Sequence, residues 1–164
     1  MTTIRSADPA DIPAVIRLTA LWAAEEPSTT GHYAYNRAED LQQRLGTTFW
    51  VAEVEHVVVG FLLGTLNGDA DCAMLYQVVE KGESHLCLDQ VYVHPDHRNV
   101  GIGSALVSRC RSAAEAQGIT CCIVASQTTD WPRTLRFYEK QGFRPWYFKM
   151  FTGLSTEERG KDDP

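Results

Sequence analysis

The stretch VYVHPDHRNVGIGSALV, from Val91 to Val107, joins an apolar strand-like run to a helical run through a turn that holds two glycines. Backbone N–H groups in the first turn of a helix have no partner inside the helix, and the helix dipole favours negative charge there. Gly101 and Gly103 have no side chain to hold an anion away, and Arg98 adds a planar charged donor. The stretch therefore predicts a site for a phosphate or diphosphate group.

Two other phosphate-binding turns do not fit these residues. The dinucleotide-binding fingerprint requires a third glycine or an alanine where this chain has Leu106. A P-loop requires Gly-Lys-Ser or Gly-Lys-Thr after four spacer residues, and the chain has no such run. From the turn alone, an ordinary left-handed turn before a helix remains the alternative.

The composition of the 164-residue chain is that of a globular protein, with 44% hydrophobic and 22% charged residues. A formal net charge of −6 argues against binding along a nucleic-acid backbone, which requires clustered Lys and Arg. No apolar run approaches the ~20 residues of a membrane span, and the N-terminus does not resemble a secretion signal. We therefore expect a cytoplasmic protein without a membrane or nucleic-acid partner, whose five cysteines are reduced.

Apolar periodicity and turn residues indicate strands and helices in mixed order. The expected elements are a strand near Ile4, a helix capped by Asp8 and Pro9, a short helix within 37–45, strands over Phe49–Val54 and Val57–Leu66 joined at Glu55 and His56, a strand over His85–Val93, a helix over Gly103–Gln117, a strand over 119–126 buried on both faces, a helix over Pro132–Gln141 and a strand over Phe143–Phe151. This order predicts one α/β domain with a mixed sheet.

Two segments do not fit that pattern. The segment 67–84 is expected to be a hairpin extension or an insertion, and the charged segment 155–164 a disordered tail after a domain that spans 1–154. The late strand is apolar on both faces around Trp146, which leaves open whether it is core or the edge of a homodimer.

The glycine turn and a second motif together resemble the GNAT superfamily of acetyltransferases. The family's marks are a Val-x-Val strand followed by Arg-x-x-Gly-x-Gly, here Val91 to Gly103, and a downstream helix with Phe-Tyr before Gly-Phe, here Phe137 to Phe143. Two marks in order about 35 residues apart are far more specific than either alone. The resemblance implies a mostly antiparallel central sheet flanked by helices, with splayed central parallel strands.

The resemblance also implies acetyl-CoA as the donor, with no metal. It places the diphosphate on the amides of the turn, and the pantetheine arm against the exposed edge of the strand that ends at Val93. The arm enters the gap between this strand and the next, at 119–125. The residues implied to bind acetyl-CoA are Val91, Tyr92, Val93, Arg98, Asn99, Val100, Gly101, Ile102, Gly103 and Ser104.

The chain departs from the family pattern in one respect. Many members carry Asn six residues before the Phe of Phe-Tyr and Ala three before it, and here those positions are Trp131 and Thr134. The family's Asn often contacts the pantetheine, so this contact is in doubt, with Asp130 or Thr129 as its replacement.

Acetyl transfer to an amine requires a group that removes the ammonium proton, a donor to the oxyanion and an acid for the leaving thiolate. The resemblance makes Tyr138 the acid and a backbone amide near Val91 the oxyanion donor. From the residues alone, Tyr138 reads as a core aromatic.

Asp89 is the candidate base, because strand alternation places it on one face with Cys87, Val91 and Val93. A buried structural role for Asp89 stays open, as do Glu53, Glu83 or a water chain as the base.

The expected acceptor is a small primary amine with a further cationic or polar group. Trp22, Tyr33 and Tyr35 lie where the family builds its acceptor pocket, although each of them taken alone reads more readily as an ordinary loop or core aromatic. Acidic residues near the presumed pocket favour a cationic acceptor, with a purely solubilising role as the open alternative: Glu25, Glu26, Glu55, Asp69, Asp71, Glu80 and Glu83. Two alternative functions stay open: a CoA-binding sensor without turnover, and an enzyme that acts on a protein amine.

His94 and His97 lack a third ligand at a usual spacing, so no metal site is expected.

Overall fold

The computed structural model describes residues 1–26, 36–67, 78–79, 83–126, 128 and 130–146. Within these ranges the elements follow in this order: β1 (Thr2–Ser6), η1 (Pro9–Asp11), α1 (Ile12–Glu25), α3 (Ala38–Gln43), β2 (Phe49–Val54), β3 (Val57–Asn67), β4 (His85–Val93), η4 (Pro95–His97), α4 (Ile102–Glu115), β5 (Cys121–Val124) and α5 (Trp131–Glu139).

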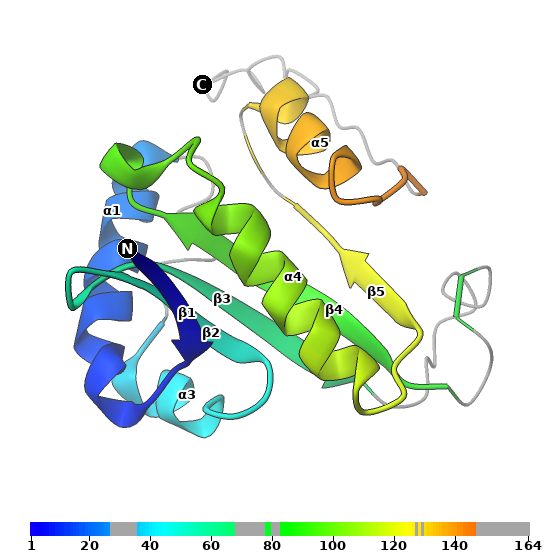
Figure 1. Cartoon of the computed structure of the whole chain (residues 1–164), viewed down its shortest axis with the longest axis horizontal. Coiled ribbons are helices and arrows are strands. Elements are labelled where there is room, and N and C mark those ends of the chain that lie inside the picture. Colours follow the sequence, from blue (N-terminus) through cyan, green and yellow to red (C-terminus); the bar gives the residue numbers. More distant parts are fainter. Residues whose placement is uncertain (27–35, 68–77, 80–82, 127, 129, 147–164) are drawn as a thin grey trace, which may run out of the picture.

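The strands form one sheet in the order β1-β2-β3-β4-β5 (Figure 1). The first three pairings are antiparallel, and only β4 and β5 are parallel. The expected fold class, a mostly antiparallel mixed sheet flanked by helices, is confirmed. β2 and β4 have the predicted bounds, and the turn between β2 and β3 is at Glu55 and His56, both with positive φ. Such a two-residue loop matches the twist of a hairpin.

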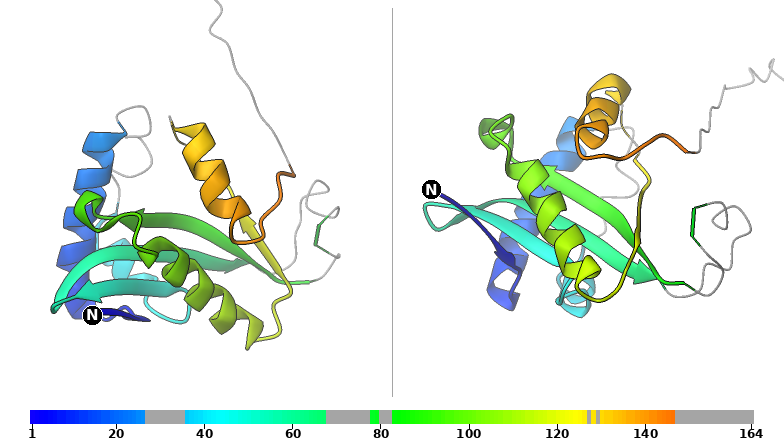
Figure 2. Two further views of the ribbon diagram at one scale, coloured as in Figure 1. Left: turned by 45° about the horizontal axis from the view of Figure 1, so that its top comes forward. Right: turned by 45° about the vertical axis from the view of Figure 1, so that its right-hand side comes forward.

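Helices cover the two faces of the sheet, α4 on one and α1 on the other (Figure 2), and an apolar cluster lies beneath each. On one face, α4 packs through Ile102, Leu106, Cys110 and Ala114, and Gly118 follows its last turn with a φ of 82°. On the other face, α1 packs through Ile12, Val15 and Leu18. Trp22 packs against the same cluster, whereas Ile16 and Leu21 are 36% and 43% exposed.

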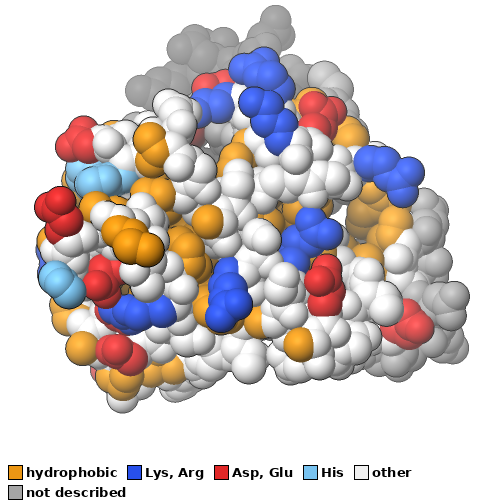
Figure 3. Space-filling model, viewed as in Figure 1, with side chains coloured by type: hydrophobic (Ala, Val, Ile, Leu, Met, Phe, Trp, Pro, Cys, Tyr) orange, Lys and Arg blue, Asp and Glu red, His pale blue; other side chains and the backbone are white. Residues whose placement is uncertain are grey.

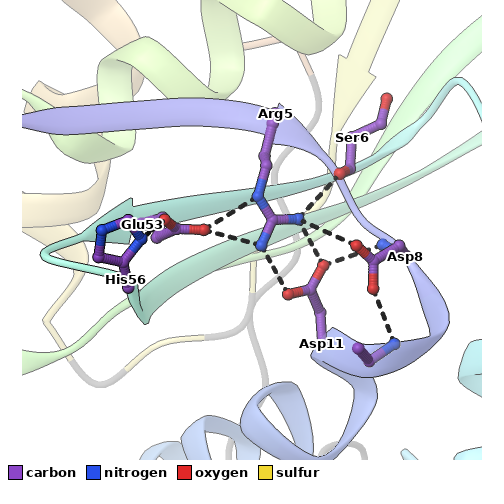
Figure 4. Close-up of polar contacts among 7 residues, drawn as sticks. Arg5, Ser6, Asp8, Asp11, Glu53 and His56 are labelled. Carbon is purple, nitrogen blue, oxygen red and sulfur yellow. Dashed lines mark hydrogen bonds and ion pairs between the residues drawn. The ribbon is translucent and has the colours of Figure 1, made fainter.

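The entry to α1 is held by a charged network around Arg5 (Figure 4). Asp8 caps the first turn as predicted, although this turn is the 3₁₀ segment η1 rather than α-helix. The Arg5 guanidinium donates to both oxygens of Asp11, at 2.7 and 2.8 Å, and to Glu53 of β2. Because the side chain of Asp11 is only 6% exposed, Arg5 provides the charge that allows this carboxylate to be buried.

The parallel pair β4 and β5 diverges within the sheet. β5 pairs with β4 from His85 to Leu88, whereas β4 continues to Val93 along an edge that β5 does not follow. In Figure 1 the chain after β5 leads away from β4 toward α5. This is the splay expected from the resemblance.

A β-bulge in β4 corrects the predicted orientation of Asp89. Leu63 pairs with Gln90 and Gly64 with Leu88, so Asp89 is the extra residue between them. A bulge shifts the alternation by one residue. Val91 and Val93 therefore lie on the α4 face with Leu88, while Asp89 hydrogen-bonds to Cys87 and does not share their face.

Two predictions about the C-terminal third are wrong in detail. β5 was expected to be buried on both faces, but Cys121–Val124 is only partly buried, and Val124 faces a cleft. Residues 143–146 of the predicted last strand have no regular structure, and 147–151 lie outside the described residues. Most of the 67–84 segment and all of the 155–164 segment also lie outside them.

Candidate acetyl-donor and acceptor site

A cleft of ≈ 680 Å³ opens where β4 and β5 diverge. Its walls come from the end of α1, the second half of β4, the turn before α4, the end of β5 and one side of α5. This volume lies within the range of small-molecule and cofactor sites. The predicted turn and both predicted catalytic residues, Asp89 and Tyr138, line this cleft.

The glycine turn exposes backbone amides to the cleft. Asn99 and Gly101 have φ angles of 64° and 90°, and Gly101 is the N-cap of α4 without any side-chain cap. The first N–H of α4 that bonds back into the helix is that of Ala105, to the carbonyl of Gly101. The amides of Ile102, Gly103 and Ser104 precede it, so they are available to an anion.

Gly101 and Gly103 are required to be glycine for different structural reasons, the backbone conformation at Gly101 and the close approach of a neighbour at Gly103. At Gly101 a Cβ would meet nothing within 4 Å, but the left-handed φ would strain it. At Gly103 a Cβ would lie 3.2 and 3.3 Å from ring atoms of Phe137, so α5 packs directly on the turn. Nine of the ten predicted donor-binding residues line the cleft. The exception is Val100, whose side chain points to solvent and is 72% exposed.

Arg98 is tied to the protein and is less available to a phosphate than we expected. Its Nε donates to the carbonyl of Val93 at 2.8 Å, and its Nη2 forms an ion pair with Glu25 of α1 at 2.8 Å. The hydroxyl of Tyr92 also donates to Glu25, and Trp22 stacks on the Tyr92 ring at 5.3 Å. Burial, together with this hydrogen bond, raises the pKa of Tyr92 above its usual range. Arg98 and Glu25 therefore fix the end of α1 to the donor-binding turn.

Asp89 is held by two donors from neighbouring elements. Its Oδ2 accepts from the guanidinium of Arg44, just after α3, and from the hydroxyl of Thr65 in β3 at 2.6 Å. Arg44 also donates to the carbonyl of Gly64, at 3.2 Å. The Cys87 thiol also donates to the Asp89 carboxylate. Arg44 and Thr65 therefore anchor Oδ2, while no described N–H or O–H group donates to Oδ1.

Tyr138 lies on α5 among other aromatic rings. It makes edge-on contacts with Phe137 and Phe143, at ring-centroid distances of 4.9 and 5.4 Å, and it is partly buried against the α4-side core. These contacts fit the core role that the residues alone suggested, and its place in the cleft wall fits the role implied by the resemblance. Both descriptions apply to the same side chain.

The start of α5 shows what stands in place of the family's Asn. Asp130 accepts from the amide of Arg133 at 3.2 Å as the helix N-cap, and it lines the cleft. Thr134 also lines the cleft, whereas Trp131 is 47% exposed and does not. Thr129 lies outside the described residues. Its neighbour Thr128 donates to Glu26 at 3.2 Å and so links this loop to α1.

The other predicted groups fall into three sets. Trp22, Glu25, Glu26 and His97 line the cleft. Glu53 is paired with Arg5, while Glu55, Glu83 and His94 are not part of the cleft wall. Tyr33, Tyr35, Asp69, Asp71 and Glu80 lie outside the described residues.

Two findings concern metals and membranes. In the described ranges no three His, Cys, Asp or Glu side chains come together as a metal site, although the rings of His94 and His97 are 5.9 Å apart. No described helix is long and apolar enough to cross a bilayer.

Sequence reasoning missed the partners of the charged site residues. Arg44 is 45 residues from Asp89, and Glu25 is 73 residues from Arg98. No local pattern indicates such pairs. The cations of α5 were also missed, although the spacing of Arg133, Arg136 and Lys140 follows the helical repeat and could have indicated a common face.

A protein-family model described as an acetyltransferase (GNAT) domain matches residues 45–145. An amino-acid acetyltransferase of Pseudomonas fluorescens (strain Pf0-1) is 28% identical over 110 residues, which are 66% of this chain and 21% of that enzyme. The chain thus spans about a fifth of the length of this curated relative.

Solved structures share the fold. An aminoglycoside acetyltransferase, HMB0005, from an uncultured soil metagenomic sample superposes with a TM-score of 0.68 at 19% identity, covering 94% of this chain and 99% of its own. A transcriptional regulator from Bacillus halodurans C-125 superposes with a TM-score of 0.69 at 23% identity, covering 94% and 100%.

Proposed function

The chain belongs to the GNAT acetyltransferases, and on that premise we propose that it transfers the acetyl group of acetyl-CoA to a primary amine of a small cationic molecule. The observation that carries this proposal is the cleft between β4 and β5. It brings together the free amides at the start of α4, the open edge of β4, Tyr138 and Asp89.

The donor fits the groups on the cleft wall. The amides of Ile102, Gly103 and Ser104 would hold the diphosphate, and the unpaired edge of β4 would align the pantetheine amides. When bound, acetyl-CoA supplies a thioester carbonyl carbon for attack by the acceptor nitrogen. Arg98 contributes by holding the turn rather than as an open phosphate ligand, because Glu25 and the Val93 carbonyl already engage it.

The residues at the divergence of β4 and β5 would manage the protons. The open Oδ1 of Asp89 would take the acceptor's ammonium proton, directly or through water, since a free amine is required for attack. A β4 amide near Val91 would donate to the oxyanion. As the C–S bond breaks, the Tyr138 hydroxyl would give its proton to the sulfur.

The acidic side of the cleft supports a cationic acceptor. Glu26 and Asp89 stand on the α1 and β4 side, and Glu25 adds a carboxylate that is paired with Arg98. Such carboxylates concentrate cations in a cleft, although each exposed pair is worth only about 0.2–1 kcal/mol. The acetyltransferases of aminoglycosides and amino acids among the similar proteins are consistent with a small-molecule amine.

The test is release of CoA, measured by chromatography, across a matched panel of polyamines, aminoglycosides, neutral amino acids and acidic amino acids. We expect the cationic acceptors to have the highest kcat/KM. Faster turnover of acidic acceptors would refute the acceptor class and leave the acetyltransferase assignment standing. Tight acetyl-CoA binding without CoA release on any amine or peptide would favour a sensor.

A further inference from the structure

Three cations on α5 line the cleft without an ion pair to the rest of the described chain. Arg133, Arg136 and Lys140 are exposed on its wall, and none of them forms a salt bridge with any other described residue. By contrast, Arg5, Arg44 and Arg98 are each paired with a carboxylate. Unpaired cations gathered in a cleft are unexpected in a chain with a net charge of −6, and they would attract an anion.

The three cations share one side of α5. Taking Phe137 as the reference and ~100° per residue, Arg133, Lys140 and Arg136 lie ~40°, ~60° and ~100° to one side of it. Tyr138 lies ~100° to the other side. In the space-filling view, Lys and Arg side chains gather at the top, over α5 (Figure 3). The helix therefore divides the cleft into a basic end and an end that carries Tyr138.

The contact of Phe137 with the glycine turn locates the basic end. The Phe137 ring packs on Gly103, so the cations lie within about one helical turn of the amides that would hold the diphosphate. Tyr138 lies on the opposite side of Phe137 around the helix, so a group bound at the basic end lies away from the proposed proton donor. Acceptor groups react at the Tyr138 end, so an anion on the donor suits the basic end better than an anion on the acceptor.

We infer that Arg133, Arg136 and Lys140 bind the 3′-phosphate on the ribose of coenzyme A. This inference rests on the proposed function and extends it to a preference for the 3′-phosphorylated donor. A phosphate monoester carries about −1.5 to −2 charges at pH 7, which two or three flexible cations can contact together. The diphosphate amides hold both donor forms equally, so the basic side of α5 is what distinguishes acetyl-CoA from its 3′-dephospho form.

The experiment is calorimetric titration with acetyl-CoA and with 3′-dephospho-acetyl-CoA at low and moderate salt. We expect the wild-type chain to bind acetyl-CoA about 10-fold more tightly, a ratio that corresponds to 1.4 kcal/mol. The ratio should shrink at higher salt, because the contacts are solvent-exposed. In Arg133→Gln/Arg136→Gln/Lys140→Gln the ratio should fall to near 1 while the affinity for the dephospho form is unchanged.

Controls separate this inference from the proposed function. Arg17→Gln removes one exposed arginine of α1 that is not part of the cleft, so it should keep the wild-type ratio. Arg136→Gln alone should give an intermediate ratio if the triple variant does not fold. Equal wild-type affinities for both forms, or a ratio that survives in the triple variant, would overturn this inference alone. A wild-type chain that binds neither form would overturn the proposed function together with it.

Discussion

At the residue scale, Tyr138 is the sharpest test of the chemistry. We expect Tyr138→Phe to lower the rate of acetyl transfer by about 10²–10⁴, the usual cost of losing a general acid, and to leave the affinity for acetyl-CoA nearly unchanged. The ring contacts with Phe137 and Phe143 do not involve the hydroxyl, so packing should survive the change. Single-turnover kinetics measure the chemical step directly. An unchanged single-turnover rate would reduce Tyr138 to a packing residue.

Asp89 needs a paired experiment, because it has both a structural and a chemical role to test. With Asp89→Asn, only acceptor that is already deprotonated can react, and this fraction falls about tenfold for each pH unit below an amine pKa near ~10.4. We therefore expect the loss in kcat/KM to grow as the pH is lowered. The measurement is a pH profile of kcat/KM for wild type and variant.

The matched variant for Asp89 is Arg44→Gln. It removes the same ion pair but keeps the carboxylate that would take the proton. If Asp89 is the base, Arg44→Gln should retain more activity than Asp89→Asn and should show a flatter pH dependence. Parallel losses in the two variants at every pH would show that Asp89 only anchors Arg44.

At the scale of elements, the Arg5 network joins β1, η1 and β2. Burial raises the pKa of Asp11, but its hydrogen bonds from Arg5 and from the Asp8 amide outweigh burial, so the net pKa is below the usual value. A lowered pKa contributes stability that is present above the unfolded pKa of ~3.9 and is lost as the pH falls toward the folded pKa. The wild-type chain should therefore lose this contribution in acid.

We expect Arg5→Met to lower the free energy of unfolding at pH 7 by about 3 kcal/mol, because it leaves a buried carboxylate unpaired. At pH 3 the difference between variant and wild type should shrink, since protonation relieves the unpaired charge. Urea denaturation at both pH values measures this. Arg17→Met, at an exposed position of α1, is the control and should change little. A pH-independent loss would show that Arg5 stabilises only by packing.

Elements governed by local signals could be predicted from the sequence. The β-branched runs of β2 and β3 and the cap at Asp8 are properties of neighbouring residues, and these elements were predicted to within a few positions. The bulge at Asp89 could not be predicted, because it depends on the register of β3 against β4. The bounds of β4 were therefore predicted correctly, but the one inserted residue made the predicted orientation of Asp89 wrong.

The candidate site divides in the same way. The glycine turn is a local motif, so the position of its amides could be predicted, whereas the engagement of Arg98 by Glu25 depends on where the far end of α1 lies. The solvent orientation of Val100 follows from the left-handed residues on either side of it, Asn99 and Gly101. Such tertiary contacts leave no trace in a short window of sequence.

At the scale of the whole molecule, the cleft separates charge that the net value of −6 conceals. Carboxylates from α1 and β4 stand on one side, and the cations of α5 stand on the other. On the proposed function, the cations of α5 would attract a donor with phosphates, and the carboxylates would attract an acceptor with ammonium groups. Such a separation of charge could attract two oppositely charged substrates without requiring a large net charge on the chain.

Binding of the donor should stabilise the whole fold, and Gly101 allows a controlled test. Acetyl-CoA at 100 times its Kd should raise the free energy of unfolding by about 2.7 kcal/mol. Gly101→Glu should abolish this gain, because it places bulk and negative charge at the amides of α4.

Gly118→Glu is a matched control. Gly118 has nearly the same φ, 82° against 90° at Gly101, and a Cβ at either position would have nothing within 4 Å. Gly118, however, follows the other end of α4. Both variants should lose about 1–2 kcal/mol from backbone strain. Only Gly118→Glu should then regain stability with acetyl-CoA in thermal and chemical denaturation. A folded Gly101→Glu protein with the full ligand-induced gain would show that the diphosphate binds elsewhere.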